Sequence, residues 1–217
     1  MWAVCTFLCL LVGVYALRFV FTGFADVPDD VASNDFLSPG GLRLHIAVTA
    51  LAIITAPWQF ARRLRDRHPL VHRTMGRIYL VAGFVGIGTG TAIALGSSQG
   101  LVAGLGFLCL GLAWLTVTAV AYRMILVRDY GAHRRWMLRS FSLIFGAVTL
   151  RIYLPLSFAL GLDFGSSYPV IAWLNWVPNI VVIEWWIRHE PLRPHSRQIP
   201  SVPQPGPLES LPRRQAD

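Results

Sequence analysis

Two histidines stand in similar surroundings, and imidazole is a common axial ligand of haem iron. Haem in a helical bundle is held by two imidazoles that project from facing helices at equal depth. The residues therefore predict a haem b site, with the alternative that both histidines cap helices or contact lipid phosphate at the membrane interface. The two stretches are Arg65-Asp66 followed by His72-Arg73, and Arg128-Asp129 followed by His133-Arg134.

A second group of polar residues lies at the other ends of the apolar segments. Ionisable side chains inside a membrane are costly and usually face the bundle interior, a cavity or a partner. The group predicts a pocket for a small anionic ligand, such as a haem propionate, a lipid phosphate or a carboxylate. The alternative is pairing with Asp26, Asp35 or Asp163, or extension of the outermost arginines to the membrane surface. Its members are Arg18, Arg43, His45 and Arg151.

The last apolar segment has a polar face made of Asn175, Asn179 and Glu184. Their spacing is close to helical periodicity. Glu184 falls at about the depth of Arg77 and Arg139, so a structural ion pair is expected there, with a proton-relay site as the alternative.

These residues must be positioned by membrane-spanning helices. Of the 217 residues, 54% are hydrophobic and only 14% are charged, which is typical of an integral membrane protein. A span needs roughly 20 apolar residues to cross a hydrocarbon core about 30 Å thick. The sequence predicts an all-α bundle of about six transmembrane helices, Trp2–Phe24, Gly41–Phe60, Met75–Gly96, Leu101–Val127, Trp136–Leu160 and Tyr168–Ile187. The likeness of the two histidine stretches predicts that the second and third spans are repeated as the fourth and fifth.

Arginine placement predicts the orientation of the bundle. All 19 basic residues are arginines, and 16 of them fall between spans two and three, between spans four and five, after span six, or at the span ends that adjoin these connections. By the positive-inside rule that side is cytoplasmic, so we expect both termini in the cytoplasm and the bundle in a bacterial inner membrane. The spread of the arginines over separate loops does not suggest a nucleic-acid-binding surface.

The chain divides into a membrane domain, residues 1–188, and a tail, residues 189–217. The tail is rich in proline and lacks apolar periodicity, so we expect it to be disordered and cytoplasmic. Gly86 and Gly90 have the small-xxx-small spacing that lets membrane helices approach closely. Pro69 disfavours a helix that would hold His68 and His72 on one face, and the three cysteines lack metal-ligand spacing, so no metal site is predicted.

Several short motifs of this sequence resemble a family of bacterial predicted membrane proteins, domain of unknown function 2306. They are His45, Pro57-Trp58-Gln59-Phe60, His72-Arg73, Gly76-Arg77-Ile78-Tyr79, His133-Arg134-Arg135-Trp136-Met137 and Arg139-Ser140, and they extend over roughly residues 40 to 155. The resemblance implies a multi-span membrane fold and transfers no activity.

Three classes of function remain open. They are a redox protein with haem between His72 and His133, a transporter or lipid-handling protein with an anion near Arg151, and a membrane-complex subunit without a site. The sequence shows no nucleophile motif, carboxylate pair or phosphate-binding loop that would suggest a hydrolase or a pump. The one partner that all three share is the lipid bilayer.

Overall fold

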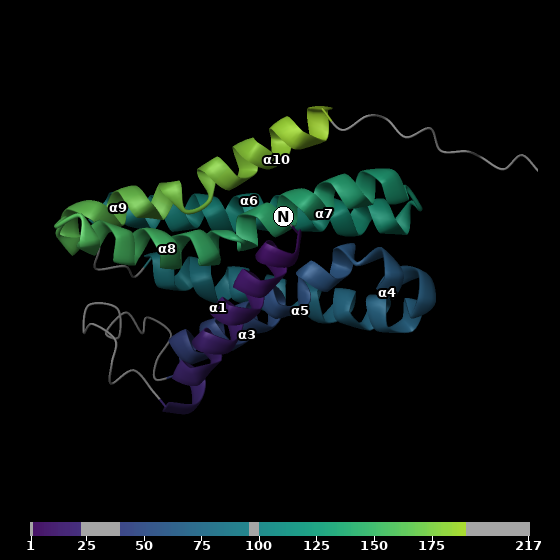
Figure 1. Cartoon of the computed structure of the whole chain (residues 1–217), viewed down its shortest axis with the longest axis horizontal. Helices are drawn as coiled ribbons and strands as arrows, with labels where there is room; N and C mark the ends of the chain where they lie inside the picture. The colour runs from purple at the N-terminus through teal and green to yellow at the C-terminus, as the bar shows by residue number, and fades with distance from the viewer. Residues whose placement is uncertain (1, 23–39, 96–99, 190–217) are drawn as a thin grey trace, which may run out of the picture.

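The computed structural model describes residues 2–22, 40–95 and 100–189, and all secondary structure in these ranges is helical (Figure 1). The predicted tail lies outside the described residues except for His189. The helices are α1 (Trp2–Thr22), α3 (Gly41–Thr55), the 3₁₀ helix η1 (Pro57–Phe60), α4 (Arg62–Arg67), α5 (Pro69–Leu95), α6 (Gly100–Leu126), α7 (Tyr130–Ile144), α8 (Gly146–Ala159), α9 (Phe164–Leu174) and α10 (Val177–His189).

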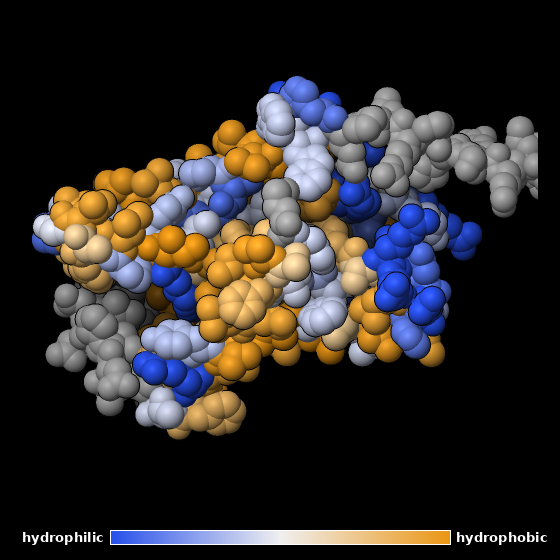
Figure 2. Space-filling view, in the orientation of Figure 1, coloured by the Kyte–Doolittle hydropathy of each residue, from blue (hydrophilic) through white to orange (hydrophobic). Residues whose placement is uncertain are grey.

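Six of the described segments are long and apolar enough to cross a membrane, which confirms the predicted fold class. The spans are α1, α3 with η1, α5, α6, α7 with α8, and α9 with α10. Figure 2 shows hydrophobic surface across the middle of the molecule, with hydrophilic atoms gathered at the end that holds α4 and the α6–α7 turn. We call this the arginine-rich end, and the end that holds the α8–α9 turn the opposite end.

The third and fifth spans begin six residues earlier than predicted, at Pro69 and Tyr130. Proline is favoured in the first turn of a helix because its missing N–H needs no partner there, so Pro69 starts α5 instead of delaying it. Asp129 caps α7 by accepting a hydrogen bond from the Ala132 amide at 2.8 Å. Charged residues in the first turns of these helices lower the local hydropathy, so the apolar pattern predicts a later start for each helix.

The structure does not confirm the predicted internal repeat. Asp129 is the N-cap of α7, whereas its counterpart Asp66 lies inside the short helix α4 and pairs with Arg62 and Arg65. One similarity does hold, because His72 is the fourth residue of α5 and His133 is the fourth residue of α7.

The fifth and sixth spans are each interrupted near their middle, at Phe145 and at Asn175-Trp176. The second break is stabilised by buried amides. Asn175, only 1% exposed, donates to the carbonyl groups of Ile171 and Ala172, both at 2.9 Å. Such breaks are tolerated inside a membrane when side chains satisfy the freed backbone groups. Figure 1 shows that α10 leaves the line of α9 and points away from the rest of the bundle.

Glycines set the closest helix contacts, as the spacing of Gly86 and Gly90 predicts. A Cβ atom on Gly86 would lie 2.8 Å from the Thr49 side chain, and one on Gly90 would lie 2.8 Å from the His45 ring. These two glycines therefore hold α5 against α3. Gly13 does the same for α1, since a Cβ there would approach Ile54 on α3 to 2.5 Å.

Candidate functional site

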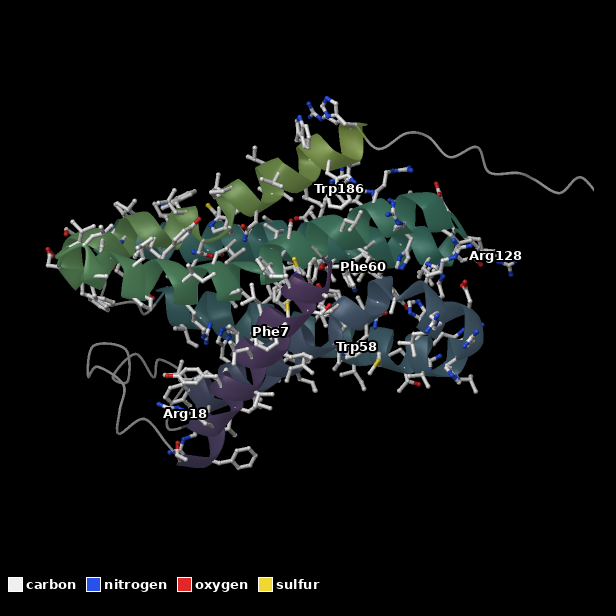
Figure 3. All side chains as sticks on the ribbon, in the orientation of Figure 1. Phe7, Arg18, Trp58, Phe60, Arg128 and Trp186 are labelled. Carbon is white, nitrogen blue, oxygen red and sulfur yellow. The ribbon has the colours of Figure 1, made fainter. Side chains whose placement is uncertain are left out.

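A cavity of about 1490 Å³ opens at the arginine-rich end. Its walls come from the start of α1, η1, α4, the first turns of α5, the end of α6, α7 and α10. The inner walls are apolar and aromatic, and the rim is basic. The apolar wall includes Trp2, Phe60, Leu80, Met137, Phe141, Phe145, Val182, Ile183 and Trp186, and the basic rim includes Arg62, Arg63, Arg65, Arg73, Arg77 and Arg134. In Figure 3, Phe60 and Trp186 lie on either side of α7, with Arg128 marking this end of the bundle.

His72 and His133 both line this cavity, from α5 and α7. They are close enough for charges on the two rings to interact. The structure thus brings the two imidazoles to the wall of one cavity, although this placement does not arise from a demonstrated repeat. His133 Nδ1 lies 2.8 Å from the Ala121 carbonyl oxygen and must donate to it, which leaves Nε2 of the neutral ring as an acceptor.

Two buried polar atoms at the cavity wall have no hydrogen-bond partner among the described residues, His72 Nδ1 and Gln59 Nε2. A buried donor or acceptor without a partner costs about 1–3 kcal/mol. Gly76, one turn after His72 on α5, lets the Gln59 side chain pack against this helix, since a Cβ on it would lie 3.1 Å from Gln59 Oε1. The cavity wall therefore has an imidazole nitrogen and an amide N–H group that are available to hydrogen-bond a ligand.

Part of the basic rim has no carboxylate to neutralise it. Arg62 and Arg65 share Asp66, at 3.4 Å and 3.3 Å. No ion pair within residues 2–22, 40–95 and 100–189 involves Arg63, Arg73 or Arg77. An apolar cavity with a cationic rim suits a molecule that has a large apolar body and anionic groups at one end.

A family model described as "Predicted membrane protein (DUF2306)" matches residues 42–187. The chain belongs to this family. The matched region begins in α3 and ends in α10, so it contains both cavity histidines and excludes α1. No curated protein and no solved structure matches the chain.

The four residues predicted to form an anion pocket at the opposite end of the DUF2306 protein lie in two different environments. His45 Nδ1 lies 3.1 Å from both the Gly86 carbonyl oxygen and Thr89 Oγ1, which fixes the ring between α3 and α5. Arg151 on α8 is close enough to His45 for their charges to interact, and its guanidinium lies deep among protein atoms although part of the side chain stays accessible. Arg18 and Arg43 are exposed, and Arg18 packs on the ring of Tyr15 at 4.6 Å.

The predicted polar face of the last span also separates into two parts. Asn179 donates to Thr149 Oγ1 at 3.2 Å and to the Asn175 carbonyl oxygen at 2.8 Å, so together with Asn175 it joins the α9–α10 break to α8. Glu184 forms a two-pronged ion pair with Nε and Nη2 of Arg139 on α7. The expected structural ion pair is present, and Arg139 also packs over the Trp136 ring at 4.5 Å.

The centre of the bundle contains a buried hydroxyl network that the sequence analysis did not predict. Ser140 Oγ lies 2.5 Å from the Tyr79 hydroxyl and 2.8 Å from Thr118 Oγ1, and it accepts from Trp114 Nε1 at 3.0 Å. The network joins α5, α6 and α7. Trp114 offered a signal, because a tryptophan in mid-span is away from the interface where this residue is enriched.

Proposed function

We propose that this DUF2306 protein binds an amphipathic cofactor in the cavity at the arginine-rich end, and that the cofactor is haem b held between His72 and His133. The observation that carries the proposal is that two half-buried imidazoles, from two different helices, line one cavity with apolar sides.

The residues around the cavity fit the chemistry of haem. His133 donates Nδ1–H to the Ala121 carbonyl oxygen, which is the orientation that presents Nε2 to a metal. His72 Nδ1 is buried without a hydrogen-bond partner among the described residues, so no bond at that atom commits the ring to another role. Phe60, Phe141 and Val182 would contact the macrocycle, and the basic rim would hold the propionates. Bound haem would supply one-electron transfer.

The test is an absorption spectrum of the full chain, purified in detergent from cells supplied with a haem precursor. We expect a Soret band and, after reduction, the sharp visible bands of a low-spin haem with two imidazole ligands, at about one haem per chain by extraction. Absence of haem from correctly folded protein would overturn the proposal. Native mass spectrometry of that sample would then report whether the cavity holds an anionic lipid instead, the second ligand that the unpaired arginines favour.

The proposal includes an orientation in a bacterial inner membrane, with the cavity and both termini on the cytoplasmic side. Arginine-rich loops are retained in the cytoplasm during insertion. Reporters fused after Arg63, Ser98, Arg128, Asp163 and His195 should therefore read cytoplasmic, periplasmic, cytoplasmic, periplasmic and cytoplasmic. A periplasmic signal at Arg63 or Arg128 would contradict this orientation.

A further inference from the structure

Each cavity histidine has a residue of the buried hydroxyl network further along its own helix. Tyr79 follows His72 by seven residues on α5, and Ser140 follows His133 by seven residues on α7. Seven residues are about 10 Å of helix and almost two full turns, so the two members of each pair lie on one face of their helix. Both helices begin at the arginine-rich end, so Tyr79 and Ser140 lie deeper in the bundle than the histidines.

A hydrogen bond between Tyr79 and Ser140 joins α5 to α7. The Tyr79 hydroxyl lies 2.5 Å from Ser140 Oγ, and the two residues are only 1% and 0% exposed, so water does not compete for the bond. Each is the eleventh residue of its helix, as His72 and His133 are each the fourth. Because the two helices run in the same direction, a bond that brings the deeper pair to one level also brings the histidines to one level.

The neighbouring helix α6 runs in the opposite direction and fixes the same face of α7 at two points. His133 donates to the Ala121 carbonyl oxygen at 2.8 Å. Two turns deeper, Ser140 accepts from Trp114 Nε1 at 3.0 Å. Trp114 lies seven residues before Ala121, so the two contacts are two turns apart on α6 as they are on α7. The Trp114 ring also packs on α5, since a Cβ on Gly83 would lie 3.4 Å from it.

Ser140 is the centre of the hydroxyl network, and its own hydroxyl is fully used. A serine hydroxyl can donate one hydrogen bond and accept two. Trp114 Nε1 can only donate to it, so of Tyr79 and Thr118 one donates to Ser140 and the other accepts from it. Loss of this one hydroxyl would therefore break three buried contacts and release α5 and α7 to rotate about α6.

We infer that Tyr79 and Ser140 are positioning residues, whose hydrogen bond turns His72 and His133 toward the cavity at equal depth. The inference rests on the proposed role of the two histidines as ligands of one cofactor. Neither Tyr79 nor Ser140 lines the cavity, so both act through the helices that carry the histidines. Two imidazoles must face each other to bind one metal axially, so rotation of either helix would remove a ligand from a bundle that is still folded.

The test compares Ser140→Ala and Tyr79→Phe with Ser157→Ala in the full chain. Ser157 is a matched control, because it is also buried but donates to the Leu154 carbonyl oxygen of its own helix at 2.8 Å. We expect Ser140→Ala to convert most of the bound haem to a high-spin form or to lose it, while Ser157→Ala keeps the wild-type spectrum. Tyr79→Phe removes only the hydroxyl, so it should show the same change to a smaller extent even if Ser140→Ala does not fold.

A second readout does not depend on haem. Spin labels on His72→Cys and His133→Cys, in a chain whose three native cysteines are alanine, report the distance between α5 and α7. We expect one narrow distance distribution that broadens with Ser140→Ala or Tyr79→Phe and not with Ser157→Ala. Unchanged distributions in both network variants would overturn the inference, whether or not haem is bound.

Two other outcomes separate this inference from its alternatives. A lower Tm of Ser140→Ala with an unchanged haem spectrum would also overturn the inference, because it would assign the network a purely stabilising role. Absence of haem from the wild type, with distributions that still broaden in the network variants, would overturn the haem proposal and support the positioning of the two histidines.

Discussion

Gly86→Leu is expected to destabilise the bundle by at least about 1–3 kcal/mol, the cost of overpacking a filled contact between helices. Even the first carbon of the new side chain would lie 2.8 Å from the Thr49 side chain and 3.6 Å from Val48. Both neighbours lie on α3, so α3 must move away from α5. That movement would also break the hydrogen bond between His45 and the Gly86 carbonyl oxygen.

Gly88→Leu is the matched control. Gly88 is on the same helix, is exposed, and has no atom within 4 Å of the position that a Cβ would occupy. Replacing glycine in a helix gains up to about 1 kcal/mol of helix propensity in either variant, so the difference between them isolates the contact with α3. Detergent-titrated unfolding of both proteins measures it. Similar stabilities would contradict the close packing of α3 on α5.

Glu184→Gln should be the second damaging substitution, with a loss of about 1–3 kcal/mol, below the range for fully buried pairs. The Arg139 and Glu184 side chains are 17% and 32% exposed, so water or lipid headgroups screen the pair in part. The neutral amide leaves the Arg139 guanidinium without its counter-charge. Because this ion pair joins α10 to α7, we expect α10 to separate from the bundle and the cavity wall formed by Val182 and Trp186 to loosen.

Two further variants distinguish an ion pair from a general sensitivity of α10. Val181→Ala shortens an exposed apolar side chain on the same helix, one turn before Glu184, and should change stability little. The double variant Arg139→Leu/Glu184→Leu should recover much of the loss, since apolar replacement of both partners removes the unpaired charge. Protease accessibility of α10 provides the readout. A double variant less stable than Glu184→Gln alone would contradict this account of the pair.

Much of the fold could be predicted because a membrane imposes a length and a composition on every span. The six apolar segments, the close contact at Gly86 and Gly90, and the pairing of Glu184 at its depth all follow from that constraint. The breaks at Phe145 and Asn175 do not follow from this constraint on length and composition. Both lie inside continuous apolar runs, and the side chains that satisfy the broken backbone come from the same run or from another helix.

For the candidate site residues, the sequence predicts only how deep each one lies in the membrane. Position along a span places Arg18, Arg43, His45 and Arg151 at one end, but it does not give the rotation of each helix, and these helices are apolar on most sides. Arg18 and Arg43 therefore turn outward while His45 and Arg151 turn inward. The cavity beside His72 and His133 depends on the departure of α10 from the bundle, which no local pattern in the sequence indicates.

The proposed role of His72 and His133 as haem b ligands is tested by the reduced-minus-oxidised absorption spectra of His72→Ala and His133→Ala beside that of His68→Ala. His68 is exposed, lies four residues before His72 and does not line the cavity. We predict that the His68 variant keeps the low-spin spectrum and full haem content, while the other two lose most of the haem or convert it to a high-spin form. Unchanged low-spin haem in both His72→Ala and His133→Ala, or no haem in the wild type, would show that these histidines do not hold haem.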